Sequence, residues 1–245
     1  MAFSHFKLLS EVNNKDVFFT RIRIYKNSID NVIWVDCDFA IHSFNINLYQ
    51  QLIIHLPANI NNSVLKRQAE FLSGRYIACL ALMQLGFSKP PKVSIGDDRA
   101  PIWPDGIYGS ITHNAKRAIC ILGENNCYLG IDIEDKLSDN AAQEIGSYVQ
   151  TNDELALFYG SAISKSLAIT IIFSAKESLF KAIYPQVNVY FDFKCAQLVD
   201  VDLNLKILTF KLSPQFCTQH QINDSYRVFF DETKSLVKTM VLMNR

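Results

Sequence analysis

The sequence of 245 residues has no surplus of charge of either sign, because 24 Lys and Arg residues balance 24 Asp and Glu residues. Proteins that bind nucleic acid or anionic membranes commonly carry a basic excess, so the composition argues against both partners. No apolar run approaches the ~18 residues of a membrane span, and Glu11, Lys15 and Asp16 interrupt the place of a signal-peptide core. We expect a cytoplasmic protein with no membrane span and no nucleic-acid partner.

Cysteine is scarce as well. The chain has six cysteines and no Cys-x-x-Cys pair, which is too few for a disulfide scaffold in a chain of this length. Low-complexity linkers and repeats of identical residues are also missing, so the chain is not a repeat array. We expect free thiols in a reducing compartment.

What the sequence does have is enough apolar surface for a globular fold, because 49% of its residues are hydrophobic and 12% are aromatic. A chain of this length forms one domain or two closely joined subdomains. Both halves mix helical and strand patterns, with a boundary near residues 123–127. We predict an α/β (α+β) protein of two packed subdomains, residues 1–125 and 126–245.

The first half is predicted to open with two strands and a long helix. Residues 17–25 and 31–39 are rich in Val, Ile, Phe and Trp, which favours strands. Apolar residues recur at helical spacing over 63–85, with Ser63 placed to cap the start and Gly86 just past the end. A stretch with several Pro and Gly residues follows, and short strands are expected around residue 110 and at 118–122.

The second half is predicted to begin with a strand at 128–134 and then a group of helices. One helix lies near 140–148, another begins at Thr151 with a capping box completed by Glu154, and a longer one runs from about 166 and stops before Pro185. Apolar runs within 187–199, 205–212, 226–230 and 236–242 predict antiparallel strands.

The first chemical feature is the pair of carboxylates in Gly-Ile-Asp-Ile-Glu, residues 130–134. Residues i and i+2 of a strand point to one face, so Asp132 and Glu134 share a face while Ile131 and Ile133 take the other. Like charges this close favour a cation between them, and oxygen ligands suit a hard ion such as Mg²⁺. A solvated polar strand face is the alternative interpretation.

The second feature is Phe-Ser-Ala-Lys-Glu-Ser-Leu-Phe-Lys at 173–181, where Glu177 and Lys181 project from the same helical face. The pair could offer a carboxylate to a metal and a cation to a phosphate. It could equally be an ordinary ion pair on a helix surface.

The third and fourth features could bind anions. Arg67 and Arg75 are eight residues and ~12 Å apart on the predicted long helix, so both could serve one elongated anion, and Gly74 between them suggests a close approach. Further on, Thr112 and His113 offer a hydroxyl and an imidazole at a strand end. A charged helix surface and a structural histidine are the alternatives.

Together, these four stretches resemble the larger, monomeric class of 4'-phosphopantetheinyl transferases, close to the enterobactin and surfactin synthetase type. The resemblance runs in order from about Lys66 to Pro185 and weakly over the C-terminal strands. Residues 130–134 and 173–181, at the family's spacing, are its most diagnostic parts. The stretch from Arg67 to Arg75 points to the enterobactin-type branch.

The resemblance implies a fold of two similar, pseudo-twofold-related α/β subdomains with coenzyme A in the cleft. It implies transfer of 4'-phosphopantetheine from coenzyme A to a serine of an apo carrier protein, with release of adenosine 3',5'-bisphosphate. The carriers would be acyl, aryl or peptidyl carriers, or carrier domains, of fatty-acid, polyketide or nonribosomal peptide synthases. The first subdomain would bind coenzyme A, and the second would hold the metal, the catalytic residues and, near residues 140–167, the docking site for the carrier.

Site residues follow from the same resemblance. It implies Mg²⁺, replaceable by Mn²⁺, on Asp132, Glu134 and Glu177, with Glu177 also the base and Lys181 stabilising or protonating the leaving phosphate. The implied contacts to the phosphates of coenzyme A are Arg67, Arg75 and His113, then Ser110, Thr112 and Arg99, together with Lys176 and Lys181.

Two rival functions use the same residues. One is a catalytically silent carrier-binding protein that keeps the fold, which loss of a metal carboxylate would have favoured. The other is a Mg²⁺-dependent nucleotide phosphohydrolase, which would need no protein acceptor.

Overall fold

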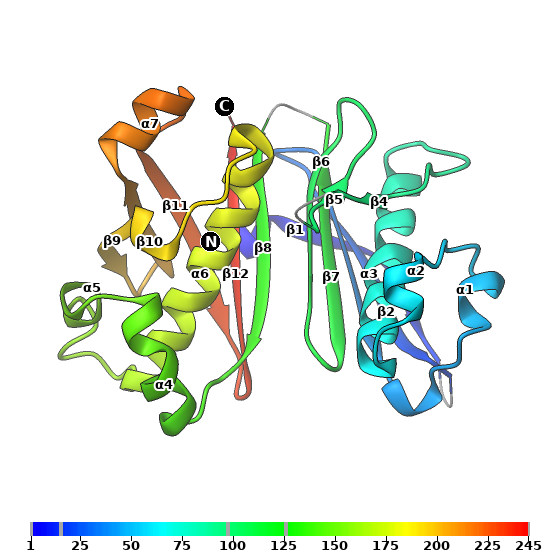
Figure 1. Ribbon diagram of the computed structural model, residues 1–245, viewed down its shortest axis with the longest axis horizontal. Helices are drawn as coiled ribbons and strands as arrows, with labels where there is room; N and C mark the ends of the chain where they lie inside the picture. The colour runs from blue at the N-terminus through cyan, green and yellow to red at the C-terminus, as the bar shows by residue number, and fades with distance from the viewer. Residues whose placement is uncertain (1, 15–16, 97–98, 125–126, 245) are drawn as a thin grey trace. The chain divides into compact units, whose positions relative to one another are not determined.

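The computed structural model describes residues 2–14, 17–96, 99–124 and 127–244. The chain divides into two compact units, one over Ser4–Cys127 and one over Tyr128–Arg245 that also takes in the first three residues. Each unit has its own five-stranded sheet (Figure 1). The prediction of a mixed α/β fold with two sheet-containing subdomains is confirmed. None of the helices among the described residues is both long enough and apolar enough to cross a bilayer.

The unit Ser4–Cys127 is a five-stranded sheet in the order β1-β2-β3-β7-β6, with antiparallel neighbours, covered by the long helix α3. A two-stranded β4–β5 hairpin and two short helices complete it. Its elements are β1 (Phe6–Asn13), β2 (Phe19–Asn27), β3 (Val32–Phe39), α1 (Leu48–Gln51), α2 (Ala58–Asn61), α3 (Leu65–Gln84), β4 (Ser94–Ile95), β5 (Pro101–Ile102), β6 (Tyr108–His113) and β7 (Arg117–Gly123).

Helix α3 packs its apolar face on the sheet. Leu72, Ile77 and Leu82 are fully buried there against strands β3 and β7. The predicted cap was wrong, because the helix begins after Val64 without a side-chain cap, and the Ser63 hydroxyl instead donates to Ile60 O at 2.6 Å.

The unit from Tyr128 onward has the sheet order β8-β12-β11-β10-β9. Helices α4 and α6 pack on each other, and α6 also packs on β11 and β12 (Figure 1). Its elements are β8 (Cys127–Asp135), α4 (Asp139–Val149), α5 (Asn152–Ala156), α6 (Lys165–Val187), β9 (Ala196–Asp202), β10 (Ile207–Leu212), α7 (Pro214–His220), β11 (Ser225–Glu232) and β12 (Leu236–Asn244).

Strand β8 and helix α6 make main-chain contact at one point. A Cβ at Gly130 would lie 1.9 Å from Ser178 O and 3.0 Å from the Cβ of Ala182, so only glycine fits there. The strand that carries Asp132 and Glu134 thus lies directly against the helix that carries Glu177 and Lys181.

Helix α6 is longer than the sequence predicted. It continues through Pro185 to Val187 and ends where Asn188, at φ 50°, donates its N–H to Tyr184 O at 2.9 Å. A proline in the last turn removes only the bond to Lys181 O, which the helix tolerates because its apolar face is buried in the core.

Most predicted elements are present, and several elements lack a prediction. The capping box of Thr151 and Glu154 is confirmed at the start of α5. Strand β1, the hairpin of β4 and β5 and helix α7 had no predicted counterpart. The apolar run at 187–199 is only partly a strand, because β9 starts at Ala196 after a 3₁₀ turn at Phe193–Cys195.

Candidate active site

An acidic cluster lies where β8 meets α6. Lys181 Nζ donates to Asp132 Oδ1 at 2.5 Å, and Ser174 Oγ donates to the other oxygen, Oδ2, at 2.9 Å. The Asp132 side chain is 3% exposed, whereas that of Lys181 is 26% exposed. An ordinary ion pair between Glu177 and Lys181 was the alternative interpretation of the sequence, but the short ion pair of Lys181 is with Asp132, and Glu177 interacts with Lys181 over a longer range.

The charges of this cluster do not balance. Burial raises the pKa of the Glu134 carboxyl to about 8, with repulsion from Asp132 adding to it. Burial likewise raises the pKa of Glu177, against the opposing effect of Lys181. Burial alone would lower the pKa of Lys181, but Asp132 and Glu177 outweigh it and raise that pKa. These shifts mean that the Lys181 ammonium group alone does not offset the cost of ionising all three carboxyls.

This donor set suits a hard divalent cation. Asp132, Glu134 and Glu177 offer only oxygens, which Mg²⁺ prefers, and an added cation would relieve the raised pKa values of Glu134 and Glu177. In the described part of the chain, no three or more His, Cys, Asp or Glu side chains are already arranged as a metal shell. Asp132, Glu134 and Glu177 are therefore candidate donors and not a preformed shell, and other oxygens would have to complete the coordination.

A basic cavity of about 500 Å³ lies in the unit Ser4–Cys127. Four of the predicted anion-binding residues line it, Arg67 and Arg75 from α3, Arg99 from the β4–β5 hairpin and His113 from β6. A Cβ at Gly74 would lie 3.1 Å from Ile111 Cγ2, so the close approach predicted at this glycine is to a strand side chain.

Glu70, another residue that lines this cavity, lies close to Arg67 and His113. Arg67 Nη1 lies 3.0 Å from His113 Nε2, and His113 Nδ1 lies 3.7 Å from Glu70 Oε2. A guanidinium group can only donate, so Nε2 accepts and the proton of the neutral imidazole is on Nδ1, facing Glu70. Glu70 is thus an acidic neighbour of the imidazole, at a distance longer than a hydrogen bond, and it was not among the residues predicted for the site.

Arg75 brings a buried donor without a partner to this cavity. Its guanidinium stacks 4.6 Å from the Phe71 ring centroid, and its buried Nε has no hydrogen-bond partner. Burial lowers the pKa of Arg75 to about 10, so it remains charged at neutral pH. A buried cation with an unpaired donor is suited to receive an anion.

Ser110 and Thr112 do not line this cavity. They are 3% and 4% exposed and alternate along β6 with Ile111 and His113, which do line it. Side chains on a strand alternate between faces, so Ser110 and Thr112 point to the other face of the sheet. Their predicted contacts with coenzyme A gain no support from the cavity.

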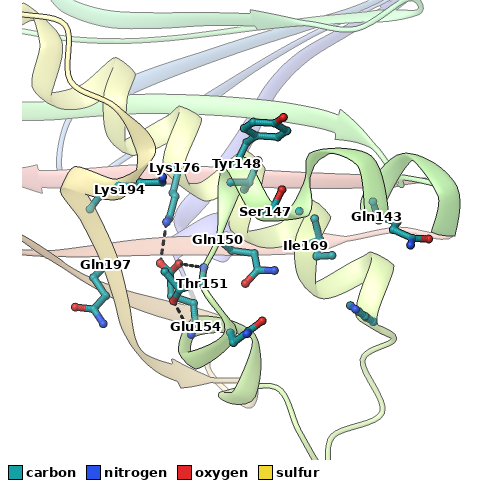
Figure 2. A pocket seen from close by; sticks show the side chains of 16 residues that line it. Gln143, Ser147, Tyr148, Gln150, Thr151, Glu154, Ile169, Lys176, Lys194 and Gln197 are labelled. Carbon is teal, nitrogen blue, oxygen red and sulfur yellow. Dashed lines mark hydrogen bonds and ion pairs between the residues drawn. The ribbon is translucent and has the colours of Figure 1, made fainter.

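Lys176 lies in an environment that the sequence did not predict. Its Nζ pairs with Glu154 at 2.8 Å and donates to Phe193 O at 3.1 Å, and both charged side chains are at most 3% exposed. Figure 2 shows this pair on the wall of a cavity of about 730 Å³ lined by α4, α5, α6 and β9. None of Asp132, Glu134, Glu177 and Lys181 lines that cavity. The ion pair differs from the phosphate contact implied for Lys176, because the ammonium group is already bonded inside the unit.

Glu154 connects three elements at this point. Its carboxylate accepts from Thr151 N at 2.7 Å and from Lys176 (Figure 2). It also accepts from Leu198 N at 2.8 Å. The capping residue of α5 is therefore also the partner of a buried cation on α6 and of strand β9.

We predict that Lys176→Met destabilises the protein by roughly 3 to 5 kcal/mol, because it leaves the buried Glu154 carboxylate without its cation. Urea unfolding would measure the loss, with Lys165→Met, an exposed lysine on the same helix, as a control expected to stay within about 0.5 kcal/mol. The double variant Lys176→Met/Glu154→Gln should lose less than the sum of the two single variants. Strict additivity would contradict the coupling.

Comparison with known proteins agrees with this two-unit arrangement. A model of the 4'-phosphopantetheinyl transferase N-terminal domain matches residues 55–123, and a model of the 4'-phosphopantetheinyl transferase superfamily matches residues 128–231. The first match contains the basic cavity residues and the second contains the acidic cluster.

Curated relatives agree with the family models. Enterobactin synthase component D of Salmonella typhi is 31% identical over 210 residues, 85% of each chain. Enterobactin synthase component D of Escherichia coli strain K12 is 37% identical over 138 residues, 56% of this chain and 65% of the relative. The 4'-phosphopantetheinyl transferase PptT of Mycobacterium tuberculosis is 30% identical over 139 residues, 57% of this chain and 61% of the relative.

The chain therefore belongs to the 4'-phosphopantetheinyl transferase superfamily, enzymes that transfer phosphopantetheine to carrier proteins. Within that superfamily its similarity is to the enterobactin synthase component D type. The family predicted from the sequence motifs is confirmed.

Proposed function

We propose that the protein transfers 4'-phosphopantetheine from coenzyme A to a serine hydroxyl of an apo carrier protein, with Mg²⁺, releasing adenosine 3',5'-bisphosphate. The observation that carries the proposal is that each of the two matched regions contains one charged site, basic in the first region and acidic in the second. A basic cavity suits a phosphorylated donor, and an acidic cluster short of positive charge suits a divalent ion. We propose that the unit Ser4–Cys127 binds coenzyme A and that the other unit holds the metal and the catalytic residues.

Each residue of the acidic cluster has a proposed role. Asp132, Glu134 and Glu177 would hold Mg²⁺, which when bound would neutralise negative charge on the diphosphate of the substrate. Glu177 accepts the proton of the carrier serine as that oxygen attacks the phosphate. Lys181 donates a hydrogen bond, or its proton, to the departing phosphate oxygen, and its partial exposure leaves it accessible for this contact.

Arg67, Arg75, Arg99 and His113 bind the phosphates of coenzyme A in the basic cavity. We assign Arg67 and Arg75 to the 3'-phosphate. Ser110, Thr112 and Lys176 remain weaker candidates for phosphate contacts, because the first two face away from the cavity and Lys176 is held by Glu154.

The acceptor is proposed to be an acyl, aryl or peptidyl carrier of a fatty-acid, polyketide or nonribosomal peptide synthase. Carrier docking is proposed on the helical region between β8 and α6. Tyr148, Leu157 and Tyr159 are 75%, 40% and 73% exposed there and offer apolar surface. We further propose a monomer in the cytoplasm, where the six cysteines, which form no disulfide in this structure, would stay reduced.

Incubation with coenzyme A and Mg²⁺, with and without an apo carrier, tests the function. A transferase consumes coenzyme A only with the carrier and adds one phosphopantetheine to it, which mass spectrometry detects. Turnover without a carrier would indicate a phosphohydrolase, and binding of the carrier without turnover would indicate a silent carrier-binding protein. A panel of apo carriers from fatty-acid, polyketide and siderophore pathways would then identify the acceptor class.

We predict that Arg67→Ala and Arg75→Ala each weaken coenzyme A binding about 10-fold or more, because a charge-assisted contact contributes roughly 1.5 to 3 kcal/mol. Calorimetry with coenzyme A and with dephospho-coenzyme A would measure the change. The penalty should shrink for dephospho-coenzyme A, and Lys66→Ala, the exposed neighbour on α3, should show little change. If each variant lost the same affinity for both ligands, these arginines would not be the residues that bind the 3'-phosphate.

A further inference from the structure

A buried chain of three hydroxyls ends on the carboxylate of Asp132. Ser174 and Ser178 on α6 and Thr239 on β12 are all 0% exposed. Ser174 Oγ lies 2.9 Å from both Asp132 Oδ2 and Thr239 Oγ1, and Ser178 Oγ lies 2.6 Å from Thr239 Oγ1. None of these hydroxyls was among the residues predicted for the site.

The proton count fixes the donor at the Asp132 end of this chain. Each hydroxyl has one proton, and that of Ser174 goes to Asp132 Oδ2 because a carboxylate oxygen accepts. The Thr239 hydroxyl can donate to the Ser174 carbonyl O at 2.7 Å, to the Ser174 hydroxyl or to the Ser178 hydroxyl. Ser178 donates to Thr239, to Oγ1 or to the carbonyl O at 3.0 Å. The bond from Ser174 to Asp132 therefore has a fixed direction, whereas the Thr239 and Ser178 hydroxyls each have both a hydroxyl and a carbonyl oxygen within reach of their one proton.

The same helix holds the carboxylate from two sides. Ser174 and Lys181 are seven residues, or two turns, apart on α6 and so face the same way. They donate to Oδ2 and Oδ1 of Asp132. Thr239 links this clamp to β12, the strand hydrogen-bonded beside β8. The plane of the Asp132 carboxylate is therefore fixed by three elements and not by its own torsion angle alone.

We propose that Ser174 and Thr239 are positioning residues that fix the Asp132 carboxylate and so set the affinity of the site for its divalent ion. The proposal rests on the proposed function, in which Asp132 is a metal ligand. Hydrogen-bonding partners behind a metal ligand orient it, and their loss typically weakens metal binding 10- to 100-fold. Ser178 belongs to the same buried chain but makes no bond to Asp132. A variant at Ser178 therefore distinguishes an effect on the position of Asp132 from a general effect on core packing.

Binding of Mn²⁺ in the presence of coenzyme A, without a carrier, tests the proposal by the electron paramagnetic resonance signal of free Mn²⁺. Ser174→Ala and Thr239→Val should raise the Mn²⁺ dissociation constant about 10-fold or more. Ser178→Ala, the matched control, should change it less than about threefold. Thr239→Ser, which keeps the hydroxyl, should stay near the wild-type value. Thermal unfolding of all four variants checks that they fold.

The outcomes distinguish the two proposals. If Ser174→Ala binds Mn²⁺ as the wild type does, or if Ser178→Ala loses as much affinity as Ser174→Ala, the positioning role is wrong while the metal site stands. If Asp132→Asn also binds Mn²⁺ as tightly as the wild type, the metal site itself is wrongly assigned and the positioning role falls with it. Should Thr239→Val not fold, Ser174→Ala and Thr239→Ser still decide, because each changes a side chain by a single atom or methyl group.

Discussion

Replacing Glu177 with glutamine is expected to reduce phosphopantetheine transfer at least about 100-fold while leaving the protein folded. The amide keeps the shape of the side chain but cannot accept the proton of the carrier serine, and general base catalysis typically contributes a factor of 10² to 10⁴. It also removes one of the charges proposed to hold Mg²⁺. Transfer to an apo carrier at saturating coenzyme A and Mg²⁺ would measure the loss.

Stability should not follow activity in this variant. Burial raises the pKa of Glu177 in the folded protein, which means that its ionised form is disfavoured there relative to the unfolded chain. Without added metal, the neutral amide should therefore unfold at the same temperature or higher. Glu11→Gln, an exposed carboxylate on β1 in the other unit, serves as the control and should keep full activity. Full turnover by Glu177→Gln would refute both proposed roles of this residue.

Removal of divalent ions is expected to abolish transfer, with Mg²⁺ and Mn²⁺ restoring it and Ca²⁺ failing to do so. Mg²⁺ requires compact octahedral coordination near ~2.1 Å, whereas Ca²⁺ accepts more ligands at ~2.4 Å. The larger shell would move the diphosphate away from the line of attack by the carrier serine, and small displacements of this kind strongly reduce rates. Rates with each ion after chelation and dialysis would provide the measurement.

The charge of the acidic cluster gives this prediction its physical basis. Asp132, Glu134 and Glu177 share one ammonium group, and the pKa of Glu134 is raised to about 8. Binding of Mg²⁺ should therefore also raise the unfolding temperature, whether or not a carrier is present. Undiminished transfer after rigorous chelation would mean that these carboxylates serve another purpose.

Local signals in the sequence predicted those parts of the fold that depend on neighbouring residues. The capping box at Thr151 and Glu154 was predicted because both partners lie within one turn, and it is present. The ion pair between Glu154 and Lys176 was not predicted, because it joins residues that are 22 positions apart in the sequence and meet only in the tertiary fold. Likewise, no local rule indicates that α6 continues through Pro185, since burial of its apolar face decides that.

In the candidate site, too, the features that depend on neighbouring residues could be predicted, and those that depend on the tertiary fold could not. Sequence spacing alone was enough to predict that Asp132 and Glu134 share one face of a strand and that Glu177 and Lys181 share one face of a helix. Which carboxylate binds Lys181 depends on how closely α6 approaches β8, and Asp132 is the partner. The alternation along β6 could have shown that Thr112 and His113 face opposite ways, but the sequence did not show which of them faces the arginines.

The contact at Gly130 has a consequence for how the protein can vary. Because main chain meets main chain there, the interval between β8 and α6 does not depend on the size or rotamer of any intervening side chain. Exchanges elsewhere in the apolar core can lower stability without altering the separation of Asp132 from Glu177. The core residues can therefore change during evolution while the distance between Asp132 and Glu177, on which catalysis is proposed to depend, is preserved. The condition is that residue 130 remains glycine.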